Sequence, residues 1–253
     1  MTLRADSPLA SALVPSPNFG PRSAGLKPSI LLLHYTGVPT AAKAIEVLSR
    51  VDCAVSCHYV IDEAGRITQM VAERDRAWHA GVACWAGETD INSASIGIEI
   101  HNPGHLLGYA DFSPRQMAAV RDLCRDIIGR HKIRPERVLG HSDVAPQRKI
   151  DPGEKFDWAW LARAGVGLWV EPAPPSEGGE IYRMGEKGPQ IGNAQAMLKA
   201  YGYGLEVTGE FDEATQFVVS AFQRHFRPAR VDGCIDRSTI DTLQRLLDAL
   251  AKR

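Results

Sequence analysis

The stretch Ser29-Ile30-Leu31-Leu32-Leu33-His34-Tyr35-Thr36-Gly37 decides the fold of the first part of this chain. Its unbroken aliphatic run predicts a strand that is buried on both faces, as in a sheet covered by helices. The run ends in polar residues, so this strand carries His34 at its carboxyl end. Further strands are predicted over 57–62, 66–70, 95–101 and 138–141.

Helices are predicted between these strands. Thr40 is the expected N-cap of a helix over 41–51. Ser113-Pro114-Arg115-Gln116 is typical of a helix start, because Ser caps the helix, Pro fits its first position and Gln follows three residues after the cap. That helix is expected to end near His131. The elements predict an α/β domain over 26–170, a mixed central sheet flanked by helices, after a loose N-terminal arm over 1–25.

A segment rich in Pro and Gly over 171–179 predicts a linker. Residues 180–253 beyond it carry an internal repeat, in which Gly209-x-x-Asp212-x-x-Thr215 recurs as Gly233-x-x-Asp236-x-x-Thr239. In each copy the Asp is expected to cap a helix. Three helices, over 189–201, 213–225 and 237–250, predict a small three-helix bundle domain.

The composition excludes several classes of protein. Of the 253 residues, 29 are Lys or Arg and 30 are Asp or Glu, so no basic excess exists for nucleic acid binding. The longest aliphatic run, 30–33, is far shorter than the roughly 20 residues that cross a bilayer, so no transmembrane segment is predicted.

Five cysteines are an odd number, which does not favour a disulfide framework, and Cys53 and Cys57 are expected to be buried structural thiols. The oligomeric state is not predicted.

His34 and His141 each end a predicted buried strand, and Asp151 follows His141 by ten residues. Two imidazoles and one carboxylate leave the fourth position of a tetrahedral zinc ion open. This arrangement suits hydrolysis, because zinc lowers the pKa of a bound water to about 7. The spacing alone also allows these to be surface or core histidines.

Five segments resemble the zinc-dependent N-acetylmuramoyl-L-alanine amidases, which share the fold of peptidoglycan recognition proteins. They are Leu32–Gly37, Val55–Asp62, Arg76–Gly81, Ser95–Ile100, and Gly140–Pro146 together with Lys149–Gly153. The resemblance implies one zinc ion on His34, His141 and Asp151. It also implies that Glu99 is the catalytic carboxylate and that Lys149 stabilises the transition state.

The residues themselves support these roles in part. Glu99 lies on a strand otherwise made of Ile, where burying a carboxylate is costly, although an outward-facing Glu fits the same alternation. Lys149 precedes Asp151 by two residues, so in an extended segment both side chains point to one side. The alternative is a solvated Lys beside Arg148.

The resemblance also suggests residues around the centre. Trp78 and His79 resemble a groove-lining segment, although Trp78 is also a typical core residue. Tyr35 and Asn102 are further candidates for lining the cleft, and His58 is expected near the site without being a ligand. The other histidines have no supporting motif and are assigned no role: His101, His105, His131 and His225.

Residues 180–250 resemble the three-helix peptidoglycan-binding module, so both parts indicate peptidoglycan or muropeptide fragments as the partner. The implied reaction is hydrolysis of the amide between the lactyl group of N-acetylmuramic acid, or its 1,6-anhydro form, and L-alanine of the stem peptide. Two alternatives are a non-catalytic peptidoglycan recognition protein, which would lack a full ligand set, and a zinc carboxypeptidase that trims the stem peptide.

The sequence carries two opposing indications of the compartment. The start of the sequence does not read as a signal peptide, and unpaired cysteines favour a reducing environment, so the cytoplasm is expected. A polymer-binding module favours the cell envelope or periplasm instead.

Overall fold

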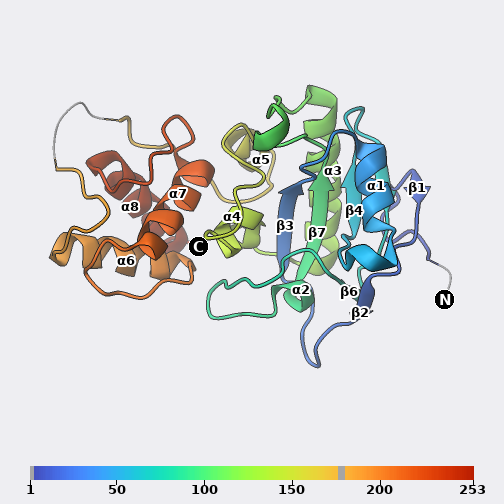
Figure 1. Ribbon diagram of the computed structural model, residues 1–253, viewed down its shortest axis with the longest axis horizontal. Helices are drawn as coiled ribbons and strands as arrows, with labels where there is room; N and C mark the ends of the chain where they lie inside the picture. The colour runs from blue at the N-terminus through green and yellow to red at the C-terminus, as the bar shows by residue number, and fades with distance from the viewer. Residues whose placement is uncertain (1–2, 176–179) are drawn as a thin grey trace.

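The computed structural model describes residues 3–175 and 180–253 (Figure 1). Within these residues a six-stranded sheet runs in the order β1-β5-β4-β7-β3-β8, beside a two-stranded sheet of β2 and β6. The strands are β1 (Ala12–Leu13), β2 (Phe19–Pro21), β3 (Ile30–Tyr35), β4 (Tyr59–Ile61), β5 (Ile67–Gln69), β6 (Asp75–Ala77), β7 (Ser95–Ile100) and β8 (Val138–Gly140). Most neighbours are parallel; β4 and β5 pair antiparallel.

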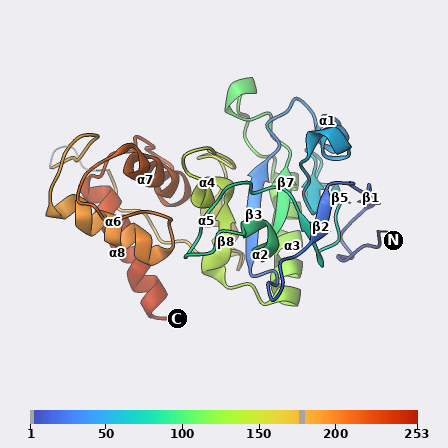
Figure 2. The same cartoon turned by 60° about the horizontal axis from the view of Figure 1, so that its bottom comes forward.

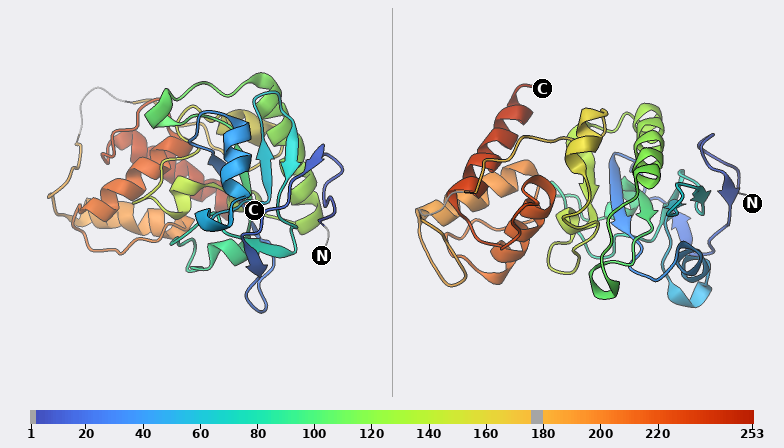
Figure 3. Two further views of the ribbon diagram at one scale, coloured as in Figure 1. Left: turned by 45° about the vertical axis from the view of Figure 1, so that its right-hand side comes forward. Right: turned by 90° about the horizontal axis from the view of Figure 1, so that it is seen from above.

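Helices cover both faces of the larger sheet. The two long ones of the first part, α1 and α3, lie on opposite faces (Figure 3), and three C-terminal helices lie beside α4 and α5 (Figure 1). The helices are α1 (Ala41–Leu48), α2 (Ile91–Ala94), α3 (Pro114–His131), α4 (His141–Val144), α5 (Trp158–Arg163), α6 (Pro189–Tyr201), α7 (Glu213–Phe226) and α8 (Arg237–Ala251). The predicted α/β fold with a helical C-terminal region is confirmed.

Alternation along the strands decides what each face of the sheet carries. Leu31 and Leu33 of β3 pack in the hydrophobic cluster formed with α3, as do Ile96, Ile98 and Ile100 of β7. Because successive side chains point to opposite faces, His34 and Glu99 face the α1 side. The functional side chains therefore lie on the face opposite the larger helix.

The predicted elements differ from the observed ones mainly at their ends. The helix predicted over 41–51 ends at Leu48, and the strand predicted over 138–141 ends at Gly140, because His141 begins α4. The two repeats cap helices as predicted: the Asp212 side chain accepts from Thr215 N at 2.8 Å, and that of Asp236 from Thr239 N at 2.7 Å.

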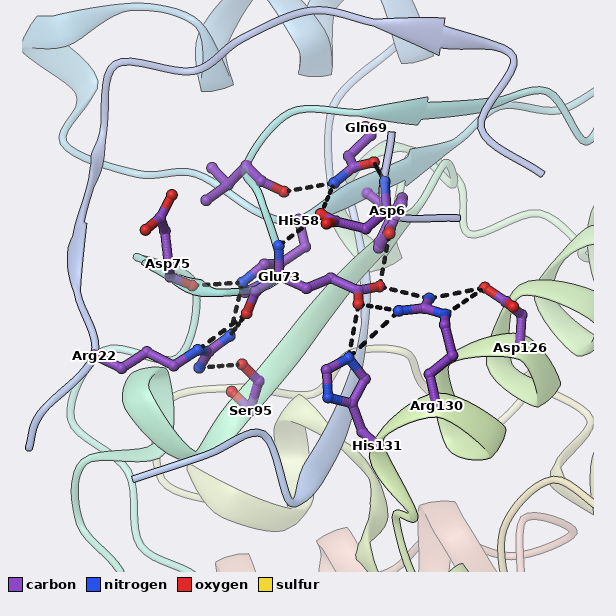
Figure 4. A network of polar contacts seen from close by, with 12 residues as sticks. Asp6, Arg22, His58, Gln69, Glu73, Asp75, Ser95, Asp126, Arg130 and His131 are labelled. Atoms are coloured by element: carbon purple, nitrogen blue, oxygen red, sulfur yellow. Dashed lines mark hydrogen bonds and ion pairs between the residues drawn. The ribbon is translucent and has the colours of Figure 1, made fainter. Parts of the chain in front are cut away.

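The N-terminal arm, expected to be loose, is bound closely from residue 6 onward. The Asn18 amide donates to the carbonyls of Arg50 and Val55. The Arg22 guanidinium donates to the carbonyl of Ser93 and to that of Ser95, the second of which Figure 4 shows. The carbonyls of Arg50, Val55 and Ser93 belong to residues outside the strands, and that of Ser95 belongs to the first residue of β7. The attachment of the arm was not predicted, because the arm lacks apolar periodicity and is held by polar hydrogen bonds.

The C-terminal helices pack directly on the first part (Figure 2). One hydrophobic cluster joins Trp85 and Leu139 to Tyr201, Tyr203 and Phe226. The predicted linker over 171–179 includes residues 176–179, which lie outside the described residues. The domain boundaries at 25/26, 170/171 and 179/180 stay predictions.

Two further expectations concern cysteines and membranes. All five cysteines are free; Cys57 is buried as expected, whereas Cys53 is partly exposed. No helix in residues 3–175 or 180–253 is long and apolar enough to cross a membrane.

Glu73 is the centre of a buried polar network (Figure 4). Its carboxylate accepts hydrogen bonds from the Tyr59 hydroxyl at 2.7 Å, from Arg130 Nη2 at 2.8 Å and from His131 Nε2 at 2.7 Å. Burial alone would raise the pKa of Glu73, but the bonds from Arg130, His131 and Tyr59 outweigh it and lower the pKa from 4.5 to about 2.

We therefore predict that Glu73→Gln flattens the acid limb of the stability curve. A depressed carboxyl pKa contributes stability that is complete above pH 4.5 and is lost as the pH falls toward 2. At neutral pH the variant should lose about 3 kcal/mol of unfolding free energy, measured by urea unfolding at stepped pH. Glu46→Gln, at an exposed pair with Lys43, is the control. An identical pH dependence in Glu73→Gln and wild type would contradict this account.

Candidate metal centre and catalytic cleft

Three side chains converge on one point beside the sheet. His34 Nδ1 lies 2.9 Å from His141 Nδ1, and Asp151 Oδ2 lies 3.3 Å from the first and 3.2 Å from the second. All three side chains are buried. Ligand atoms on a tetrahedral zinc ion stand roughly 3.3 Å apart, since each lies about 2.0–2.2 Å from the metal. The two nitrogens and one oxygen therefore fit a zinc ion with an open fourth position.

The strand order explains why these residues meet. His34 lies near the carboxyl end of β3, and His141 follows β8 directly as the first residue of α4. Because β3 and β8 are parallel neighbours, their carboxyl ends lie at the same edge. Asp151 is tied to α4 by the bond from Ser142 N to its carbonyl at 2.9 Å.

Each imidazole is oriented by a bond from its other nitrogen. His141 Nε2 donates to the Ala80 carbonyl at 3.1 Å, and His34 Nε2 donates to His79 Nδ1 at 3.0 Å. We assign these tautomers from the bond network. In these tautomers both Nδ1 lone pairs point at the common site. Metal-binding histidines are usually oriented in this way, by a hydrogen bond from the other ring nitrogen to an outer partner.

Burial sets the protonation of the centre. It lowers the pKa of His34 to about 4 and the pKa of His79 well below 6.5. Burial alone would raise the pKa of Asp151, but its interactions with His141 and His34 outweigh burial and hold the pKa well below 3.8. Near neutral pH, His34 is neutral and Asp151 is ionised, the forms that bind metal ions.

A cavity of about 350 Å³ opens above the three residues. Its polar wall includes Glu99 and Lys149, and its opposite wall is apolar, made by α1 and neighbouring residues. The lining residues of the apolar wall are Val38, Ala44, Val47, Leu48 and Val55. A cleft with one polar and one apolar wall orients a substrate that has both kinds of group.

Glu99 is placed by strand register, because it pairs with His34 across β3 and β7. Its Oε2 atom is buried and has no hydrogen-bond partner among the described residues. Burial and the charge of Asp151 raise the pKa of Glu99 well above 4.5, against the opposing effect of Lys149. An unpartnered buried carboxyl group facing a cavity is available for proton transfer.

The structure brings most of the other predicted residues to this cavity. Tyr35, Trp78 and His79 line it, and Trp78 Nε1 is buried without a hydrogen-bond partner in the described part of the chain. His58 lies behind His79, with ring centroids 5.7 Å apart, and its Nδ1 accepts from Gly97 N at 3.0 Å. Burial lowers the pKa of His58 to about 3.

Asn102 is not brought to the cavity. Its amide nitrogen donates to the Ala110 carbonyl at 2.8 Å, and its side-chain oxygen accepts from Gly104 N at 3.0 Å. The side chain therefore braces the loop after β7. A strand-end position in the sequence does not reveal which way such an amide turns.

Sequence reasoning missed a polar chain beside the cleft. The Tyr35 hydroxyl lies 3.1 Å from His105 Nδ1, and His105 Nε2 lies 3.2 Å from Glu154. The Tyr109 hydroxyl donates to the Pro152 carbonyl at 2.8 Å, and its ring stacks on His105. These polar contacts brace the loop that follows Asp151. Their residues share no spacing that the sequence could have shown.

The His-His-Asp cluster at the edge of an α/β sheet is of the kind that holds a metal ion in hydrolases. Residues 24–154 match the family model described as N-acetylmuramoyl-L-alanine amidase, and residues 187–243 match a putative peptidoglycan binding domain. This chain belongs to the N-acetylmuramoyl-L-alanine amidase family. It is accordingly a hydrolase of the amide bond between N-acetylmuramic acid and the stem peptide.

Similar proteins cover from 57% to 91% of this chain. N-acetylmuramoyl-L-alanine amidase AmiD of Escherichia coli is 35% identical over 233 residues, 87% of this chain and 82% of that protein. The 1,6-anhydro-N-acetylmuramyl-L-alanine amidase AmpD of Haemophilus influenzae is 33% identical over 163 residues, 57% of this chain and 86% of AmpD. A solved complex of E. coli AmiD with anhydro-N-acetylmuramic acid-L-Ala-D-gamma-Glu-L-Lys matches with a TM-score of 0.76 and 32% identity, covering 91% of this chain and 93% of that one.

The close approach of His79 to β7 gives a testable prediction. A Cβ added at Gly97 would lie 2.5 Å from His79 Nδ1, the atom that His34 contacts. Gly97→Ala should therefore displace His79 and cost about 1–3 kcal/mol of unfolding free energy, measured by chemical denaturation. The control is Gly129→Ala in α3, where a Cβ meets nothing within 4 Å and should stabilise the helix by about 0.5–1 kcal/mol. A Gly97→Ala protein as stable as wild type would refute the constraint.

Proposed function

We propose that this chain uses one zinc ion, held by His34, His141 and Asp151, to hydrolyse the amide between the lactyl group of N-acetylmuramic acid, or its 1,6-anhydro form, and L-alanine. The observation that carries this proposal is the convergence of the three ligand atoms under a cleft whose wall presents Glu99 and Lys149. The ligand named for the solved E. coli relative, an anhydromuramyl peptide, supports muropeptides as the substrate class.

The proposed chemistry assigns proton transfer to Glu99. A zinc ion held by His34, His141 and Asp151 would supply Lewis acidity for water activation and for polarisation of the amide carbonyl. Glu99 then takes the proton of the attacking water and returns it to the leaving nitrogen, so that L-alanine leaves as a free amine. The raised pKa makes the carboxylate of Glu99 a stronger base than that of an exposed glutamate.

The other cleft residues would position the substrate. The Lys149 ammonium group is proposed to donate a hydrogen bond to the developing oxyanion. The unpartnered Trp78 Nε1–H is proposed to donate to a substrate carbonyl, since a buried donor without a partner costs free energy until a ligand satisfies it. Tyr35 and His79 would complete the wall that surrounds the amide.

The C-terminal region is proposed to bind peptidoglycan and so raise the local concentration of scissile bonds. The compartment stays a prediction, with the cytoplasm expected and the cell envelope as the alternative. Cell fractionation with immunodetection separates the two.

Glu99→Gln tests the proposed reaction, because glutamine keeps the shape of the side chain and loses the base. We expect kcat on a soluble muramyl tripeptide to fall about 10²- to 10⁴-fold while zinc binding is retained. Lys149→Met should also lower kcat, whereas Lys43→Met, on the exposed side of α1, should leave kcat unchanged.

Mass spectrometry of the wild-type products should show an intact sugar and a peptide with N-terminal L-alanine. Release of D-alanine would favour a carboxypeptidase, and binding without cleavage a recognition protein.

Metal removal tests the cofactor. Zinc that binds only the folded state should raise the unfolding free energy of chelator-treated protein by about 2.7 kcal/mol at 100 times its dissociation constant. His34→Ala should abolish this gain and His101→Ala should keep it, because His101 pairs with Glu63 away from the centre. Unfolding with and without zinc measures both. An equal gain in His34→Ala and wild type would count against the assigned ligands.

A further inference from the structure

The Asp143 carboxylate lies at the contact between the C-terminal helices and the metal centre. It is almost fully buried and accepts three hydrogen bonds. One comes from its own α4 corner, from Gly140 N at 2.8 Å. The other two come from the C-terminal region: the Tyr203 hydroxyl donates at 2.7 Å and His225 Nδ1 donates at 2.8 Å.

Those two donors decide whether this carboxylate is satisfied. A buried carboxylate is costly unless its oxygens accept hydrogen bonds. Among the described residues before the predicted linker, Gly140 N is the one donor to Asp143, and it bonds Oδ2. Oδ1 therefore depends on Tyr203. The C-terminal region thus replaces the water that would otherwise solvate this group.

His225 is held so that Nδ1 faces Asp143. Its ring stacks on Trp158 of α5 with centroids 3.9 Å apart, and on Phe226 with centroids 4.0 Å apart. Its Nε2 atom is buried and has no partner in the described parts of the chain. The bond to Asp143 is therefore the main polar contact of this ring.

Asp143 in turn fixes the helix that carries His141. The α4 helix has four residues, too few to be stable without outside contacts. The bond from Gly140 N to Asp143 closes its first turn, and the bond from Ser142 N to Asp151 O ties it to the third ligand. The orientation of α4 sets the 3.2 Å separation of His141 Nδ1 and Asp151 Oδ2.

A second contact reaches the other side of His141. Ala86 N donates to the Gly202 carbonyl at 2.7 Å, and Cys84 N donates to that of Val144 at 2.8 Å. The segment they belong to begins at Ala80, whose carbonyl accepts the Nε2–H of His141. Both the helix that bears His141 and the segment that orients its ring are therefore bonded to the C-terminal region.

We propose that Tyr203 and His225 are positioning residues of the metal centre, acting through Asp143 and α4 on the imidazole of His141. The C-terminal region then has a second role besides polymer binding, because it completes the packing that aligns a ligand. The inference rests on the proposed zinc site and extends it to residues of the other module.

The test uses full-length protein with conservative variants. Tyr203→Phe removes one hydroxyl, and His225→Phe keeps a stacking ring without the Nδ1–H donor. Tyr201→Phe is the matched control, since Tyr201 packs at the same interface against Trp85 but makes no hydrogen bond to Asp143. His225→Asn is the rescue variant, because its amide can donate from nearly the position of Nδ1.

Zinc affinity is the first readout, measured by competition with a chelator. We expect Tyr203→Phe and His225→Phe each to bind zinc about tenfold more weakly, the size typical of outer partners of metal ligands. Tyr201→Phe should match wild type, and His225→Asn should recover most of the loss. The visible absorption of cobalt-substituted protein should shift in the first two variants, because it reports coordination geometry.

A soluble muramyl tripeptide separates positioning from tethering. Lost tethering would lower hydrolysis of the polymer alone, whereas misplacement of His141 also lowers kcat on the soluble substrate. Unchanged zinc affinity and cobalt spectrum in folded Tyr203→Phe and His225→Phe would overturn the proposal, even if their melting temperatures fall. Failure of wild type to bind zinc would instead refute the proposed metal centre. If His225→Phe does not fold, Tyr203→Phe and His225→Asn decide the matter.

Discussion

The parallel pairing of β3 with β7 and β8 is the constraint on which the centre depends. Leu33 pairs with Gly140 and His34 with Glu99, so the polar groups of three chain segments meet at one edge. A register slip of one residue would turn His34 toward α3 and put Leu33 in the cleft. The aliphatic residues that face α3 therefore do more than form a core, since they fix which side chains face the cavity.

Charge at the cleft follows from the same arrangement. Asp151 and Glu99 bring two carboxyl groups to one buried site, and Lys149 is the one Lys or Arg among the described residues that line the cavity. Burial and the charge of Asp151 raise the pKa of Glu99 against the opposing charge of Lys149, and its Oε2 atom has no hydrogen-bond partner among the described residues. A divalent cation at the Nδ1 and Oδ2 atoms would compensate this excess of negative charge. The donor set and the electrostatics thus lead to the same kind of occupant.

The sequence predicted what local signals encode. The capping residues Ser113, Asp212 and Asp236 act within one turn of the chain, so the helices they begin were found at the right residues. The strand-end positions of His34 and His141 made them candidate ligands together with Asp151, and the resemblance singled them out, because 107 residues separate the two histidines and no spacing rule links them. Features that depend on contacts between distant parts of the sequence were not predicted.

The four-residue α4 is an example of such a miss, since it is too short to show periodicity. The turn of the Asn102 amide toward Ala110 is another, because it depends on a neighbouring loop. His225 looked featureless for the same reason: its partners, Asp143 and Trp158, lie more than 60 positions away in the sequence. The role of a residue at an interface depends on the residues it contacts, and a single sequence does not show which distant residues are in contact.

The packed interface also changes how the two modules cooperate. A module on a flexible linker raises local concentration but leaves the approach of the polymer unrestricted. Here Tyr203, His225 and the Trp85 segment hold α7 against α4, so the face that the C-terminal helices present to a polymer has a fixed direction relative to the cleft. Polymer binding through that region, as proposed, would favour stem peptides that lie at a matching distance and angle from His34, His141 and Asp151. The interface that we propose to orient His141 would in this way also orient the substrate.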